Sequence, residues 1–255
     1  MAILAKAIKA IDPTPDKKSE LTLALSLLVE LAENKTREFR EEIEQSYRTA
    51  NTTENMTAPI TMVLENHSFY RAYLKSDNSK IPNEVGSAIK DFLNGGTDKI
   101  VNGVSSLVTT GLDALLGQGS AEQQEMRSYY ITVQARALVR YDISAWRRTV
   151  EASAITSHLE SCLAIYASKA SIDVKELDLN TFLIAYENQL NKMNFTNEET
   201  LEYIEYAEKI YDKLSGNSKK SEDNSSKNES RYLKAGLIKN VNKPMSPGHI
   251  ALTTL

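Results

Sequence analysis

The sequence predicts a mainly α fold, as a compact multi-helix domain of irregular topology in which a few short strands are allowed. Apolar residues recur at helical spacing in several long stretches. Signals for helix starts precede some of these stretches, and neither an internal repeat nor a set of alternating strands is visible. The 255 residues, 41% of them hydrophobic, suit one large globular domain.

The N-terminal third is expected to consist of helices. Residues 1–12 are apolar but interrupted by Lys6 and Lys9, which favours a short amphipathic helix over a signal peptide. Leucines at helical spacing predict a long helix over residues 19–47. A polar connector follows it, and a second helix is expected over residues 60–74.

Residues 85–119 differ from their surroundings because they combine few charges with repeated glycines. Each glycine inside a helix costs about 1 kcal/mol, so a helix that accepts several usually gains close packing or flexibility. We favour a buried helical pair with a turn at Gly95 and Gly96. The alternative is a hairpin that opens and inserts into a membrane.

Further helices are expected in the second half of the chain. Residues 121–169 form a continuous helical pattern, too long for one straight helix in a compact domain, so a break is expected near its middle. Another helix should begin near residue 178. A last helix is predicted over residues 196–214, because Thr196 and Glu199 have the spacing of a capping box.

The C-terminal part of the sequence is different in character. Residues 215–230 contain no apolar side chain, which predicts a disordered polar linker, since such a segment cannot offset its ordering entropy by burial. Residues 231–255 regain apolar side chains and form a tail that can dock on the domain. Residues 1–214 are therefore predicted to be a single helical domain.

Composition limits the classes of function. A formal charge of −4 argues against a nucleic-acid partner. The single cysteine, Cys162, cannot make an internal disulfide, which fits a reducing compartment. The sequence contains no run of about 18 uncharged apolar residues, the length that a single helix needs to span a bilayer. We expect a protein that is cytoplasmic at synthesis. Two possibilities stay open: release without a signal peptide, and association with membranes.

Signatures of common cofactors are missing from the sequence. The three histidines are far apart and have no metal-ligand spacing with Cys162 or with carboxylates, so no metal site is predicted. The glycine-rich nucleotide-binding patterns and the nucleophile elbow are also absent. No obligate cofactor is therefore expected.

Cys162 is the most informative residue. In a helix, it would lie on an apolar face with His158 as its neighbour one turn earlier. Three roles are open for the thiol: a small hydrophobe packed in the core, a nucleophile activated by His158, or the attachment point of a fatty acyl thioester. Catalysis would need a third group to orient the histidine, and Asp142, Glu151 and Glu160 are candidates.

A second candidate site surrounds the single tryptophan. Arg140, Arg147 and Arg148 flank Trp146 and Tyr141. Aromatic and basic side chains together suit the headgroup region of an anionic membrane. The alternative, and the more frequent explanation of such a cluster, is a helix end with ordinary arginine pairs to acidic neighbours.

Three features of the middle of the chain carry a resemblance to a known family: Cys162 within HLESCLAIYAS, the solitary Trp146 and the apolar glycine-rich stretch before them. This layout resembles the Erwinia virulence factor family, bacterial proteins of similar size that help bacteria to persist in an insect gut. The resemblance implies a fatty acyl chain, palmitate, in thioester linkage to Cys162, and association with anionic membranes.

Three functions are therefore expected as alternatives. The first is a bacterial virulence-factor-like protein that holds a fatty acyl group on Cys162, with an acyl donor and an anionic membrane surface as partners. The second is a cysteine-dependent acyltransferase or thioesterase that uses Cys162 as nucleophile and His158 as base. The third is a helical membrane-active toxin or interaction module in which Cys162 only packs.

Overall fold

The computed structural model describes residues 15–52, 55, 57–73, 81–93, 98–116, 123–134, 136–149 and 161–216. The helices and strands within these ranges are, in chain order, α2 (Pro15–Arg48), β1 (Ile60–Tyr73), α3 (Ile81–Phe92), α4 (Asp98–Leu116), β2 (Gln123–Gln134), β3 (Ala137–Thr149), β4 (Ser161–Ile172), α5 (Leu179–Lys192) and α6 (Asn197–Ser215).

The fold is mixed α and β, so the prediction of a mainly α domain is wrong. The four strands form one antiparallel sheet in the order β1-β4-β3-β2. The helix expected over residues 60–74 is strand β1, and the long helix expected over residues 121–169 is replaced by β2, β3 and β4. Both faces of β3 and β4 are covered, so these two strands carry apolar residues without the clean alternation that a half-exposed strand shows.

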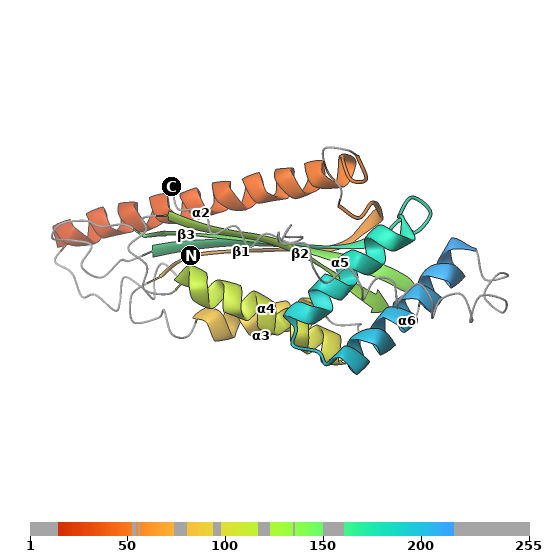
Figure 1. Ribbon diagram of the computed structural model, residues 1–255. Coiled ribbons are helices and arrows are strands. Elements are labelled where there is room, and N and C mark those ends of the chain that lie inside the picture. Colours follow the sequence, from red (N-terminus) through yellow and green to blue (C-terminus); the bar gives the residue numbers. More distant parts are fainter. Residues whose placement is uncertain are drawn as a thin grey trace, which may run out of the picture.

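The sheet lies between two helical layers (Figure 1). Helix α2 runs along one face, over β4 and β1, with its C-terminal end near β3. Helices α3 and α4 lie side by side on the opposite face, and α5 and α6 pack together at one end of that face against β2 and β3. In this arrangement the described residues form two separate apolar cores.

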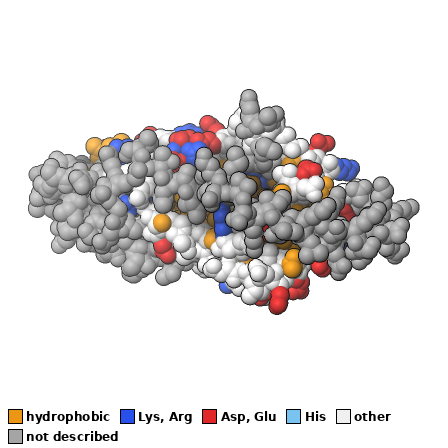
Figure 2. Space-filling view, in the orientation of Figure 1, with side chains coloured by type: hydrophobic (Ala, Val, Ile, Leu, Met, Phe, Trp, Pro, Cys, Tyr) orange, Lys and Arg blue, Asp and Glu red, His pale blue; other side chains and the backbone are white. Residues whose placement is uncertain are grey.

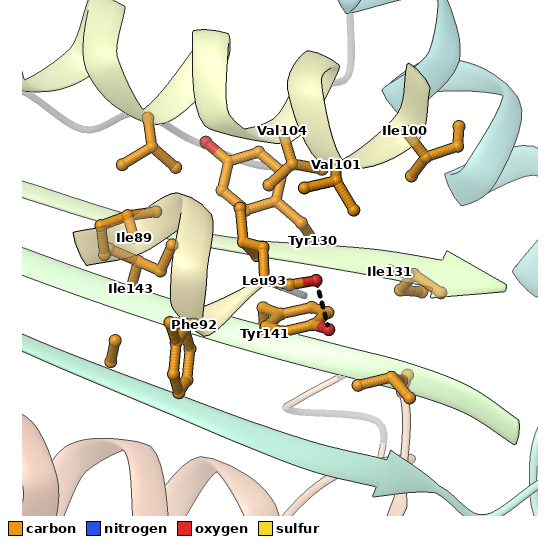
Figure 3. Close-up of a cluster of buried hydrophobic side chains, with 14 of the residues drawn as sticks. Ile89, Phe92, Leu93, Ile100, Val101, Val104, Tyr130, Ile131, Tyr141 and Ile143 are labelled. Carbon is orange, nitrogen blue, oxygen red and sulfur yellow. Dashed lines mark hydrogen bonds between the residues drawn. The ribbon is translucent and has the colours of Figure 1, made fainter. Parts of the chain in front are cut away.

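The larger core lies between the sheet and helices α3 to α6. Figure 3 shows Phe92, the last residue of α3, and Leu93, which follows it, directed toward Tyr141 and other side chains of the strands. Val104 of α4 points toward the same side chains. The hydroxyl of Tyr141 donates a hydrogen bond of 3.2 Å to the Leu93 carbonyl oxygen. Burial of this apolar surface, at roughly 25 cal/mol per Å², is the main stabilising term of the fold.

The glycine-rich stretch forms a buried helical pair, as favoured from the sequence. Helices α3 and α4 pack on each other and on the sheet. A Cβ atom at Gly103 would lie 2.7 Å from the sulfur of Met193, and one at Gly111 would clash with the sulfur of Met126. Close packing therefore accounts for these two glycines. The turn expected at residues 95–96 lies outside the described residues.

The helices predicted from near residue 178 and over residues 196–214 are confirmed. Asp178 is the N-cap of α5, and its side chain accepts a hydrogen bond from the Thr181 backbone. Thr196 and Glu199 form the predicted capping box of α6, and this helix ends at Gly216, whose φ is 79°. The predicted N-terminal helix over residues 1–12, nearly all of the linker over residues 215–230, and the tail lie outside the described residues.

Candidate functional site

Cys162 lies near the start of strand β4, and its side chain faces α2. In the sheet it is opposite Ala72 of β1 and Arg148 of β3. The residue is 0% exposed and belongs to the smaller core between α2 and the sheet. We call this core the α2 layer, and its buried members are Leu25, Leu28, Ala32, Phe39, Ile43, Ala72, Trp146, Cys162, Ala164 and Tyr166.

The surroundings of the thiol are apolar and, on the sheet side, small. Ala72 on the neighbouring strand and Ala164 two residues along β4 share its face, and both are buried. Trp146 is opposite Ala164 on β3 and belongs to the same layer. The thiol is therefore surrounded by apolar side chains. Its two neighbours on the same face of the sheet, Ala72 and Ala164, have small side chains.

Burial also sets the acidity of the thiol. Removal from water raises the pKa of Cys162 to about 11, while the backbone and the positive charge of Arg148 act in the opposite direction. At pH 7, about one thiol in 10⁴ would then be ionised. Since the thiolate is the nucleophilic form, this environment disfavours an acyltransferase or thioesterase that must regenerate its nucleophile in each cycle.

The pairing of Cys162 with His158 was predicted from helical spacing, and that premise is wrong for Cys162, which lies in a strand. His158, Glu151 and Glu160 lie outside the described residues. Asp142, the remaining candidate to orient the histidine, is opposite Ser168, six residues along β4 from Cys162, so the two side chains are roughly 20 Å apart. Asp142 therefore cannot serve a catalytic centre at Cys162.

A free Cys162 thiol is expected to react with an alkylating reagent at pH 8 at least about a hundredfold more slowly in the folded protein than in urea, because its pKa is about 11 rather than 9. The rate is followed by mass spectrometry after hydroxylamine treatment, so that every molecule begins as a thiol. A cysteine at the exposed position Arg136, in a Cys162→Ser background, is the control and should react at similar rates in both conditions. Rapid labelling of folded Cys162 would instead indicate an activated nucleophile.

The predicted membrane-binding cluster is mostly inside the protein. Arg140, Trp146 and Arg147 are buried, and Arg148 is half-buried. The Arg147 guanidinium donates a hydrogen bond of 3.3 Å to the Leu116 carbonyl oxygen at the end of α4, on the opposite face of the sheet from Trp146. Since β3 is a strand, its alternate residues point to opposite faces, and the four side chains do not form one surface.

Arg140 instead forms a buried ion pair with Asp142. An arginine paired with an acidic neighbour was the alternative interpretation of this cluster, but the pair lies within strand β3 and not at a helix end. The guanidinium approaches both carboxylate oxygens, with Nη2 2.7 Å from Oδ1 and Nε 2.9 Å from Oδ2. It also donates to the Ala58 carbonyl oxygen and to the Ser46 hydroxyl. Tyr47, near the end of α2, donates its hydroxyl to Oδ2 of Asp142 at 2.8 Å.

Two aromatic rings complete this network. The Arg140 guanidinium carbon lies 5.1 Å from the ring centre of Tyr47 and 4.9 Å from that of Tyr129, within the range of cation–π attraction. Burial raises the pKa of Asp142, and the charge of Arg140 and the Tyr47 hydrogen bond oppose this rise. The network joins the C-terminal end of α2 to the sheet and has no exposed charge to offer a ligand.

The solvent-facing side of α2 changes character along the helix. Its C-terminal half carries charge pairs such as Arg40 with Glu44, and Figure 2 shows acidic and basic side chains along the upper margin of the molecule, over α2. In the N-terminal half, Leu23 and Leu27 are 61% and 57% exposed, one helical turn apart. This half of α2 therefore has apolar side chains on two faces.

A comparison with protein-family models, with curated proteins and with solved structures gives no match. Among the residues that the structure describes, no helix is both long and apolar enough to cross a membrane. Within the same residues, no three side chains of His, Cys, Asp or Glu are grouped in a way that could hold a metal ion.

Proposed function

We propose that this chain holds a fatty acyl group as a thioester on Cys162 and uses it in association with membranes, as a virulence-factor-like protein. One observation carries the proposal: the thiol lies within the apolar α2 layer, beside two alanines. An acyl chain attached there would exchange water for hydrocarbon, a gain of about 0.8 kcal/mol for each buried CH₂ group. The resemblance to the Erwinia virulence factor family points in the same direction.

The same burial favours a stable anchor over a catalytic intermediate. Acyl transfer from a thioester donor would form the bond to the Cys162 sulfur and release the donor's thiol, with one proton passing from Cys162 to that thiol. Once formed, a thioester at a fully buried position is shielded from water, amines and other thiols. Turnover would require such an acceptor to reach it, so we place the acyltransferase and thioesterase alternatives second.

Loading and use of the acyl group would require α2 to separate from the sheet, because α2 covers Cys162. In the separated state, the acyl chain, the buried leucines Leu25 and Leu28, and the outer leucines Leu23 and Leu27 would all be available to a bilayer. A single acyl chain gives only marginal membrane binding, and stable attachment needs a second signal. We propose that the N-terminal half of α2 supplies that signal, in place of the buried arginine cluster.

The test is flotation with anionic liposomes, combined with labelling of producing cells by an alkyne analogue of palmitate. We expect the wild-type chain to carry the label and to float with the liposomes, and Cys162→Ser to lose both properties. A Leu23→Glu, Leu27→Glu double variant should keep the label. It should float at least about tenfold less, because two charges must then enter the membrane interface. A matched double variant at the exposed α6 positions Leu201 and Tyr206 is the control and should float as the wild type does. Label retained in Cys162→Ser would overturn the proposal.

A further inference from the structure

Strand β1 lies at the edge of the sheet, and most of its side chains are exposed to solvent. Among the described strands it pairs only with β4, and its residues 61–70 are all exposed. Met62, Leu64 and Tyr70 are among its exposed large hydrophobic side chains. Edge strands usually carry lysine or proline, or bulges along their length, which prevent pairing with another chain. In β1, Lys and Pro are absent, and the bulges are confined to residues 60–65.

The opposite edge of the sheet is closed by a side chain. The amide of Gln189, on α5, accepts a hydrogen bond of 2.7 Å from the Ile131 backbone nitrogen and donates one of 2.7 Å to the Ile131 carbonyl oxygen. These two bonds imitate a neighbouring strand at the middle of β2. The fold therefore blocks the β2 edge, while β1 keeps a regular run from Glu65 to Tyr73.

We infer that β1 pairs with β1 of a second copy of this chain, antiparallel and about a two-fold axis at Ser68, to give a continuous eight-stranded sheet. In an antiparallel pair about this axis, each residue is opposite the one equally far on the other side of Ser68. Glu65 of each copy is then opposite Arg71 of the other, and Asn66 is opposite Tyr70. Main-chain pairing along an exposed edge is a common mode of recognition, with side chains selecting the partner and register.

Charge complementarity selects this partner and this register. Odd-numbered residues of β1 face α3, since the His67 ring contacts Phe92 with ring centres 5.1 Å apart, whereas even-numbered Ala72 faces α2. Glu65 and Arg71 therefore lie on one face, and the axis at Ser68 forms both opposite-charge pairs at once. An axis at His67 or Phe69 forms neither pair, because Glu65 would be opposite Phe69 or Tyr73.

The first test is charge reversal in the full chain, with mass measured by light scattering after gel filtration. We expect the wild type to elute at twice the chain mass of 28.4 kDa. Glu65→Arg and Arg71→Glu should each weaken the dimer by at least about tenfold in Kd, since each replaces two attractive pairs by two repulsive ones. The double variant with both reversals should restore the dimer, which a simple loss of folding would not allow.

The second test is disulfide formation in a Cys162→Ser background, where no other cysteine competes. Ser68→Cys places two thiols opposite each other, with Cβ atoms about 5 Å apart, and should oxidise to a covalent dimer. Asn66→Cys is the matched control on the same face, and its two copies would be about 13 Å apart along the strands, so it should remain monomeric under denaturing conditions. A monomeric wild type, or equal cross-linking at both positions, would overturn the inference. Pairing of β1 with a different protein, and not with a second copy of this chain, would overturn it as well. Neither test depends on acylation, so failure here and failure of the proposed function are separate results.

Discussion

Replacing Arg140 by methionine is expected to destabilise the folded protein by about 3–5 kcal/mol, the cost of leaving one charge of a buried ion pair without its partner. Asp142 would keep only the Tyr47 hydroxyl among the contacts described above, in a position almost without solvent. The Ala58 carbonyl oxygen and the Ser46 hydroxyl would lose a donor as well. Urea unfolding followed by circular dichroism measures the change in the free energy of unfolding.

Two further variants make this result specific. Arg136→Ala, at an exposed position in the turn between β2 and β3, should change the free energy of unfolding by less than about 0.5 kcal/mol. A double variant, Arg140→Met with Asp142→Leu, should recover much of the lost stability, because buried pairs can often be replaced by apolar side chains of similar volume. A small effect of Arg140→Met alone would show that the pair is not buried as described.

Truncation of Phe39 to alanine is expected to cost about 3–5 kcal/mol, since this side chain is fully buried in the C-terminal half of α2. Trp146, the only tryptophan, lies in the same α2 layer, so its fluorescence emission should shift toward longer wavelength as α2 loosens. Leu23→Ala on the same helix is the matched control and should leave both stability and emission almost unchanged, because Leu23 is 61% exposed. Equal effects of the two substitutions would contradict the packing of α2 described here.

Helices with strong local signals could be predicted from the sequence. The leucine stripe of α2, the Asp178 cap of α5 and the capping box of α6 each depend on residues within one or two turns of one another. Such signals are largely independent of the rest of the chain. The same is true of the glycine-rich pair α3 and α4, where few charges and repeated glycines favoured a buried helical pair.

The strands were missed because their pattern depends on the tertiary structure. Strand β3 is buried on both faces and contains the Arg140 and Asp142 pair, so charged residues occur where an apolar strand face is expected. In the sequence, β2 and β3 are separated by Ala135 and Arg136, and neither is the glycine or asparagine that usually marks a hairpin. The aromatic and β-branched residues of YYITV, residues 129–133, were the signal that could have indicated a strand.

The candidate site was predicted in part. Burial of Cys162 follows from its residue type and apolar neighbours, and both are features of the sequence itself. Its proximity to His158 was inferred from helical spacing, whereas Cys162 lies in strand β4. The membrane role of Arg140, Trp146 and Arg147 assumed side chains on one surface. A strand places alternate residues on opposite faces, so an error in secondary structure changes every such neighbour.

The most direct test of the proposed function is the intact mass of the purified full chain before and after neutral hydroxylamine, compared between the wild type and Cys162→Ser. The proposal predicts a fatty-acyl excess over 28.4 kDa in the wild type, removed by hydroxylamine and missing from the variant. Hydroxylamine cleaves thioesters at neutral pH but leaves amides intact, so the loss identifies the linkage. An unmodified wild-type mass, from cells that supply fatty acyl donors, would contradict the proposal and leave Cys162 as a packed residue of the α2 layer.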